Sequence, residues 1–113
     1  MPQIFAEHFT LKDKVEYLQR KIILNCIAYY EFDWSPLDND YYKQLCEQLI
    51  KLQTEYGDIS DTQYGYVMHD FDVSTGFDLY YRLTELDRTY LTNMVTTARV
   101  AKRITHDSKG DKK

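Results

Sequence analysis

Acidic residues are grouped with aromatic ones in three short segments of this 113-residue chain. The first segment places Asp33, Asp38 and Asp40 beside Trp34, the single tryptophan. An apolar ring surrounded by carboxylates has the composition of an interface anchor with a charged rim, which would bind a basic protein surface. The competing interpretation is that Trp34 folds back onto the hydrophobic core.

The third acidic segment, which contains Asp70 and Asp72, allows two kinds of chemistry. As solvated loop acids, the two residues would extend a protein-binding surface. The run of residues 70–75 also resembles the first motif of haloacid-dehalogenase-type phosphatases, in which two Asp follow a strand and hold magnesium. That resemblance requires a strand at residues 64–68 and further βα units, for which the remaining chain is too short. We therefore favour the first interpretation, and the expected partner-binding residues are Trp34, Asp38, Asp40, Asp70 and Asp72.

Other reactive side chains do not form a recognisable catalytic or metal-binding pattern. His8, His69 and His106 are too far apart, and too far from the cysteines, for a closed zinc site. Cys26 and Cys46 are expected to be reduced and buried. We expect no catalytic residues, no metal ligands and no enzyme activity.

Two helices that form an antiparallel hairpin must position the first acidic segment. Thr10 followed by Asp13 is typical of a helix start, and apolar residues then recur every three or four positions over 11–31. A second such pattern covers 39–56, with Asp38 as its N-cap and Gly57 as its end. The two patterns predict a shared core that contains Leu18, Ile22, Leu45, Leu49 and Leu52.

The rest of the chain is expected to be an irregular aromatic loop at residues 58–76, a short helical segment at 77–83, and a further helix to about residue 104. Thr84 and Asp87 are typical of the start of that helix. Its core-facing stripe would be Leu86, Tyr90, Met94, Ala98 and Ala101. The predicted fold is mostly α, with one domain at residues 1–105 and a disordered tail at 106–113.

Composition excludes several classes of protein. Eighteen acidic and fourteen basic residues leave a net charge of −4, which disfavours direct nucleic-acid binding. No apolar run approaches the roughly 18 residues of a membrane span, and no signal peptide is recognisable, so we expect a cytoplasmic protein. Eleven tyrosines suit a surface that contacts another protein.

Residues 11–58 also resemble a known family, the N-terminal helical domain of NAD-dependent bacterial DNA ligases. Tyr29 and Tyr30 match the family's aromatic pair, Asp33 matches the acid of the turn, and Tyr42 matches the tyrosine of the second helix. The resemblance implies that these residues, with Asn39, dock the nicotinamide mononucleotide (NMN) half of NAD. Aromatic faces stack on a cationic ring, and acids or amides accept hydrogen bonds from ribose hydroxyls.

The sequence departs from the ligase pattern at two contact positions. Asn39 and Lys43 stand where the family has Asp, and Lys43 reverses the charge beside a cationic ring. The adenylation motif, a Lys followed two residues later by Asp-Gly, is absent, so no ligase-type adenylate can form. NAD or NMN therefore stays an alternative ligand, and no cofactor is expected.

These observations favour a non-catalytic protein that binds another protein. Residues 66–79 are similar to small ligase-like proteins of phages and plasmids of Gram-positive bacteria. The expected function is an inhibitor or adaptor from a mobile element that acts on a host nucleic-acid-handling or defence protein with a basic surface, as anti-CRISPR proteins do. The alternative is an NMN- or NAD-binding protein.

Overall fold

The computed structural model describes residues 8–71 and 78–108, with residues 102–108 described by their backbone alone. The chain is mostly α-helical, as the sequence predicted, and the described residues include no strand. Its elements in order are α1 (Leu11–Phe32), α2 (Asn39–Tyr56), a 3-10 turn η1 (Ile59–Asp61), α3 (Gly65–Met68), α4 (Leu79–Arg82) and α5 (Glu85–Ser108).

The two predicted hairpin helices form with the predicted ends. Thr10 and Asp13 make a reciprocal capping box at the start of α1, with N···O distances of 3.0 and 3.1 Å. Asp38 caps α2 through the backbone N–H of Tyr41 at 2.9 Å, and Gly57 ends it. Both helices therefore start where a side chain accepts hydrogen bonds from backbone donors that a first helical turn leaves free.

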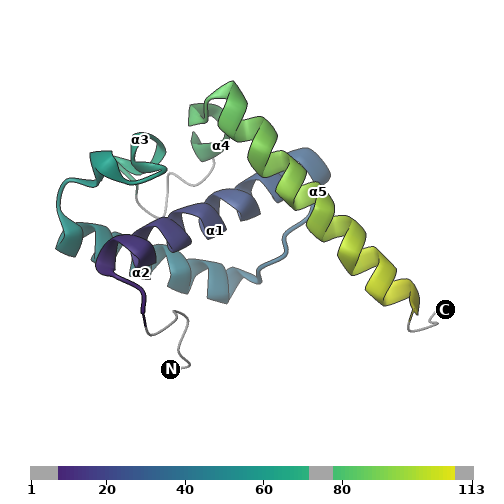
Figure 1. Cartoon of the computed structure of the whole chain (residues 1–113). Coiled ribbons are helices and arrows are strands. Elements are labelled where there is room, and N and C mark those ends of the chain that lie inside the picture. The colour runs from purple at the N-terminus through teal and green to yellow at the C-terminus, as the bar shows by residue number, and fades with distance from the viewer. Residues whose placement is uncertain (1–7, 72–77, 109–113) are drawn as a thin grey trace.

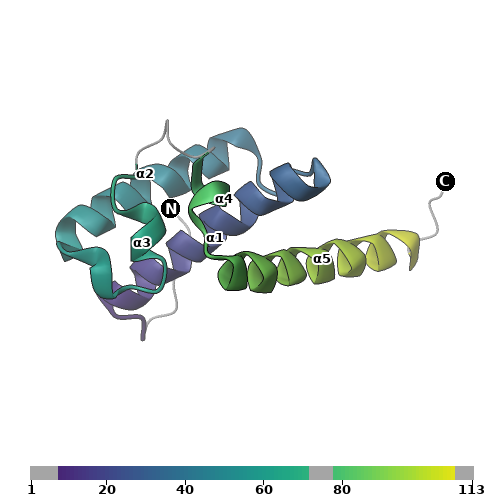
Figure 2. The same ribbon diagram turned by 90° about the horizontal axis from the view of Figure 1, so that it is seen from above.

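α1 is the central helix of the fold. It lies between α2 on one side and α5 on the other (Figures 1 and 2). α3 and α4 lie along a further side of α1: Tyr64, just before α3, bonds to Gln19, and Tyr80 of α4 packs on Tyr30 near the end of α1. Of the predicted core residues, Leu18, Ile22, Leu45 and Leu49 are fully buried, whereas Leu52 is half-buried at the edge of the same core. α1 buries residues on more than one face because it has neighbours on both sides.

Residues 58–71 are more regular than the predicted loop. They form η1 and α3, and a buried polar network rather than strand pairing holds them against α1. Gln19 of α1 lies at its centre and bonds to Gln53, to Thr62 and to the backbone N–H of Tyr64. Residues 72–77, the rest of the predicted loop, lie outside the described residues.

α5 differs from the prediction in its end and in the face that it buries. It continues to Ser108, so residues 106–108 are helical rather than part of the expected tail, and residues 109–113 lie outside the described part. Leu91 and Val95 are buried against α1, whereas the predicted core stripe is exposed. The helix carries two apolar faces, and the shorter one packs against the core.

Candidate functional site

The turn between α1 and α2 is held firmly at both ends. Asp33 ends α1 in the left-handed conformation (φ 51°), and its N–H and that of Trp34 donate to backbone carbonyls in the last turn of α1. Aspartate is among the few non-glycine residues that adopt this conformation readily. Further along the turn, the N–H of Leu37 donates to Oδ1 of Asn25 at 3.3 Å. The backbone that carries Trp34 is therefore fixed by α1 itself.

An apolar groove of about 250 Å³ lies between this turn, α1 and α5. Its lining residues are Lys21, Leu24, Asn25 and Ala28 from α1, Trp34, Pro36 and Leu37 from the turn, and Met94, Val95 and Ala98 from α5. Trp34 is half-buried, packs against the core and forms part of the groove wall. The ring therefore packs on the core, as the second interpretation expected, while the interface-anchor interpretation stays a prediction.

The polar groups of the groove are few and already engaged. Oδ1 of Asn25 accepts the hydrogen bond from Leu37. Nζ of Lys21 lies 5.4 Å from the ring centroid of Tyr17 and 5.5 Å from that of Tyr41. A ligand in the groove would therefore bind mainly by burying apolar surface.

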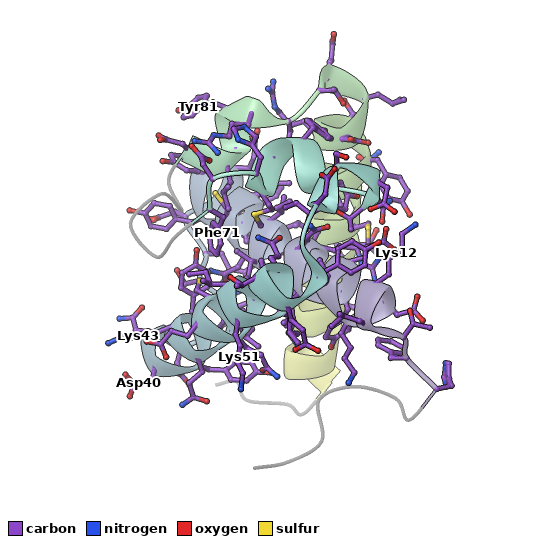
Figure 3. All side chains as sticks on the ribbon, turned by 90° about the vertical axis from the view of Figure 1, so that its left-hand side faces the viewer. Lys12, Asp40, Lys43, Lys51, Phe71 and Tyr81 are labelled. Atoms are coloured by element: carbon purple, nitrogen blue, oxygen red, sulfur yellow. The ribbon has the colours of Figure 1, made fainter. Side chains whose placement is uncertain are left out.

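Carboxylates stand at the rim of the turn. Asp33, Asp38 and Asp40 are all exposed. One oxygen of Asp38 is committed to the α2 cap, while Asp40 projects outward from the first turn of α2 (Figure 3). Thus Trp34 and two of its predicted partner-binding companions, Asp38 and Asp40, do belong to one end of the hairpin.

The aromatic pair of the ligase resemblance joins a tyrosine cluster instead of an empty site. The ring of Tyr30 stacks on that of Tyr80, with centroids 5.3 Å apart and planes inclined at 29°. Tyr29 and Tyr81 pack edge-on against Tyr30 at 5.6 Å each and are themselves 47% and 68% exposed. One face of the predicted nicotinamide-stacking residue, Tyr30, is therefore covered by a residue of α4.

The other residues of the nucleotide prediction lie at the same end of the hairpin, around the end of α1 and the start of α2. Tyr42 is half-buried, and burial together with the nearby Cys46 and Cys26 thiols raises its pKa above the ordinary value. Burial is the main cause that raises the pKa of Tyr30, and the Cys26 thiol is the second. This thiol therefore lies near the rings of both Tyr30 and Tyr42. Asn39 is exposed at the start of α2, and Lys43 projects outward there, well separated from Tyr81 in Figure 3.

Asp70 lies in a different setting from the hairpin acids. Its carboxylate pairs with the guanidinium of Arg82, which also donates to the carbonyl of Val67 at 3.0 Å. The Arg82 hydrogen bond holds the pKa of Asp70 below its usual value. Residues 65–68 are helical, so the strand that a phosphatase motif requires before Asp70 is not formed. Asp72, the second acid of that motif, lies outside the described residues.

The sequence patterns did not predict that α5 forms one wall of the groove or that α4 forms part of the tyrosine cluster. Met94, Val95 and Ala98 complete the groove, and Tyr80 and Tyr81 complete the tyrosine cluster. The repeated Tyr-Tyr pairs were a usable signal for the cluster. The groove had none, because its walls come from segments about 60 residues apart.

Comparison with known proteins adds no relative: no family model matches the chain, and no curated protein or solved structure matches it. Within the described residues, no group of three or more His, Cys, Asp or Glu side chains is arranged to hold a metal ion. None of the described helices has both the length and the apolar character needed to cross a membrane.

Proposed function

We propose that the chain is a non-catalytic protein-binding module that takes an apolar side chain of its partner into the Trp34 groove. The observation that carries the proposal is the groove itself, an apolar hollow walled by the single tryptophan and bordered by an acidic turn. Interface hot spots are enriched in tryptophan that lies in well-packed, desolvated pockets.

The charges around the groove indicate the chemistry of the partner. Asp33, Asp38 and Asp40 are exposed at the same turn. A basic partner surface would be attracted to them, and such steering raises the association rate more than the affinity. The expected partner segment therefore carries an apolar or aromatic side chain close to Lys or Arg residues.

Within this class we propose an inhibitor or adaptor of a mobile element that acts on a host nucleic-acid-handling or defence protein, in the manner of anti-CRISPR proteins. Effectors of that kind present basic nucleic-acid-binding surfaces, which an acidic module can occupy. The mobile-element origin rests on the resemblance of residues 66–79 to small ligase-like proteins of phages and plasmids, which is an expectation from the sequence alone. The absent adenylation motif supports a role without catalysis.

A groove-blocking substitution tests the proposal. Ala98→Arg places a long side chain at the groove wall, whereas Thr96→Arg adds the same group to α5 at an exposed position that does not line the groove. Both residues are exposed, so both variants should fold as the wild type does. In pull-downs from host lysate with each protein as bait, the partner should be retained by wild type and Thr96→Arg and lost by Ala98→Arg. Equal capture by both variants would contradict the groove as the binding site.

Two further variants separate the anchor from the charged rim. Trp34→Ala should abolish capture and also lower the melting temperature by several degrees, because the ring packs against the core. Asp40→Lys should lower the melting temperature only slightly, because it places a positive charge in the first turn of α2, and should slow the association rate, with a smaller effect as salt rises. An association rate that is unchanged at low salt would exclude the acidic turn from recognition.

The alternative function is binding of NMN or NAD through Tyr29, Tyr30, Asp33, Asn39 and Tyr42. A nicotinamide ring that stacks on Tyr30 from the α4 side would first have to displace Tyr80. We expect calorimetric titration with millimolar NMN to give no heat and no shift of melting temperature. Saturable heat with wild type and with Tyr66→Ala, but not with Tyr30→Ala, would instead favour the nucleotide function.

A further inference from the structure

Large apolar side chains in the wall of the Trp34 groove are partly open to solvent. Met94 of α5 is 36% exposed, and Trp34 and Leu37 are only half-buried. The groove of about 250 Å³ is smaller than the roughly 300–1,000 Å³ of a site for a drug-sized ligand, so it suits one or two apolar side chains. A short apolar segment would remove these walls from water.

The chain that precedes α1 folds back along the side of α1 that carries the groove. The ring of Phe9 packs edge-on against Tyr17, with centroids 6.0 Å apart. Tyr17 lies about 9 Å into α1 at 1.5 Å per residue. Its hydroxyl accepts a hydrogen bond of 3.3 Å from Nζ of Lys21, which lines the groove. The Phe9 ring is thus separated from the groove wall by a single side chain.

Residues 1–7, which lie outside the described residues, are long enough to reach the groove from this point. Four residues of extended chain span about 13 Å, so Phe5 can lie over Lys21 while Phe9 keeps its contact. The groove extends about 10 Å along α1, from Lys21 to Ala28. Residues 1–4 can span that length as well.

The composition of this segment fits the groove. Ile4 and Phe5 are large and apolar, and successive side chains of an extended segment point to opposite sides. One of them would face α5, and the other would face the turn between α1 and α2. Glu7 is the one charged side chain of the segment. It would enter beside Lys21, the one charged residue among the described residues that line the groove.

The other two stretches outside the described residues fit the groove less well. Residues 109–113 contain no large apolar side chain. Residues 72–77 lead into α4, which packs on Tyr30. At 100° per residue, Tyr30 lies about 160° around α1 from Ala28 of the groove. α4 and the end of this stretch therefore lie on the other side of α1.

We propose that residues 1–7 cover the Trp34 groove of their own chain, with Ile4 and Phe5 packed between α5 and the turn. A partner side chain then enters only after this segment leaves, so the segment competes with the partner. Because the segment is joined to α1, its effective concentration at the groove is on the order of millimolar, and weak contacts hold it there. The competition rests on the proposed function, whereas occupancy of the groove is independent of any partner.

The emission of Trp34, the single tryptophan, reports the occupancy. In the full chain, Ile4→Ser with Phe5→Ser should shift the emission to longer wavelength and increase quenching by acrylamide, because water reaches the ring. Gln3→Ser with Ala6→Ser is the control, since it alters the same segment without removing a large apolar side chain. Both double variants change only residues before α1, so their circular dichroism should match wild type. Equal emission and quenching in the two double variants would overturn the proposal.

Paired cysteines test the position of the segment. Phe5→Cys with Met94→Cys should form a disulfide within one chain under mild oxidation, because Met94 lines the groove. Phe5→Cys with Asn93→Cys should not, because Asn93 is exposed and does not line the groove. The native Cys26 and Cys46 are buried and do not compete. Equal cross-linking of the two pairs, or a disulfide that joins two chains, would overturn the proposal.

Partner capture separates this inference from the proposed function. In pull-downs from host lysate, Ile4→Ser with Phe5→Ser should retain more partner than wild type does, and this counts for the competition only together with the emission shift. An emission shift without any captured partner would contradict the proposed function and support the occupancy. A partner captured through the groove with no emission shift would support the proposed function and overturn the occupancy.

Discussion

Gln19 and Gln53 join the two hairpin helices through a buried hydrogen bond. Nε2 of Gln19 donates to Oε1 of Gln53 at 3.1 Å and also to Oγ1 of Thr62 at 3.0 Å. Oε1 of Gln19 in turn accepts from the backbone N–H of Tyr64 at 3.3 Å. One fully buried amide thus connects α1, α2 and the segment after η1, and each of its partner residues is buried.

Gln19→Leu should lower the free energy of unfolding by about 2–4 kcal/mol. The leucine fills most of the space but leaves the buried groups on Gln53, Thr62 and Tyr64 without their partner, and each unsatisfied group costs about 1–3 kcal/mol before relaxation. Urea unfolding followed by circular dichroism measures the change. Gln44→Leu, an exposed position on α2, is the control and should be nearly neutral. Equal stability of the two variants would show that the network contributes nothing.

Leu49→Ala and Leu86→Ala should differ strongly although the chemical change is the same. Leu49 is fully buried, and its truncation should cost about 2–5 kcal/mol because it leaves a cavity in the core. Leu86 is exposed, so stability should change by less than about 0.5 kcal/mol. Urea titrations of both variants provide the measurement, and a stable Leu49→Ala protein would contradict the assigned core.

Gly65→Ala should destabilise the protein more than Gly57→Ala does. A Cβ at position 65 would lie 1.9 Å from the carbonyl oxygen of Ile59, so the backbone of η1 has to move. At Gly57 nothing lies within 4 Å of the new atom, and the cost is the strain of a non-glycine residue at φ +95°, on the order of 1–3 kcal/mol. Thermal unfolding should therefore rank the melting temperatures wild type, Gly57→Ala, Gly65→Ala. The reverse order would contradict the close approach of η1 to α3.

The two thiols should be protected from alkylation until the protein unfolds. Burial raises the pKa of Cys26 and of Cys46 from 9.0 to about 11, so the reactive thiolate is scarce in the folded state at pH 8. Iodoacetamide labelling should be slow in buffer and fast in urea, with Thr96→Cys as an exposed thiol that reacts in both.

The raised thiol pKa also sets a pH dependence of stability. Between pH 9 and 11 the unfolded chain has lost thiol protons that the folded chain still holds, so stability falls as pH rises through this window. Cys26→Ala with Cys46→Ala should flatten that part of the profile. If the double variant loses stability as steeply as wild type between pH 9 and 11, groups other than the two thiols cause the loss of stability.

The ends of the hairpin helices could be predicted from sequence because they depend on neighbouring residues. Thr10 with Asp13, Asp38 before α2, and Gly57 after it act within one helical turn. The apolar spacing of Leu18, Ile22, Leu45 and Leu49 likewise predicted the core that they share. The mostly α fold class followed from these local signals.

Only the tertiary structure decided which face of α5 meets α1. Leu86, Tyr90 and Met94 have helical spacing as good as that of Leu91 and Val95, and periodicity does not say which of two apolar faces will find a neighbour. The choice depends on contacts with other elements, among them Phe32 of α1 beneath Arg99 and Tyr80 of α4 beneath Arg88. The same holds for the candidate site. Trp34 was found from composition, but its groove exists only because α5 crosses α1 beside the turn.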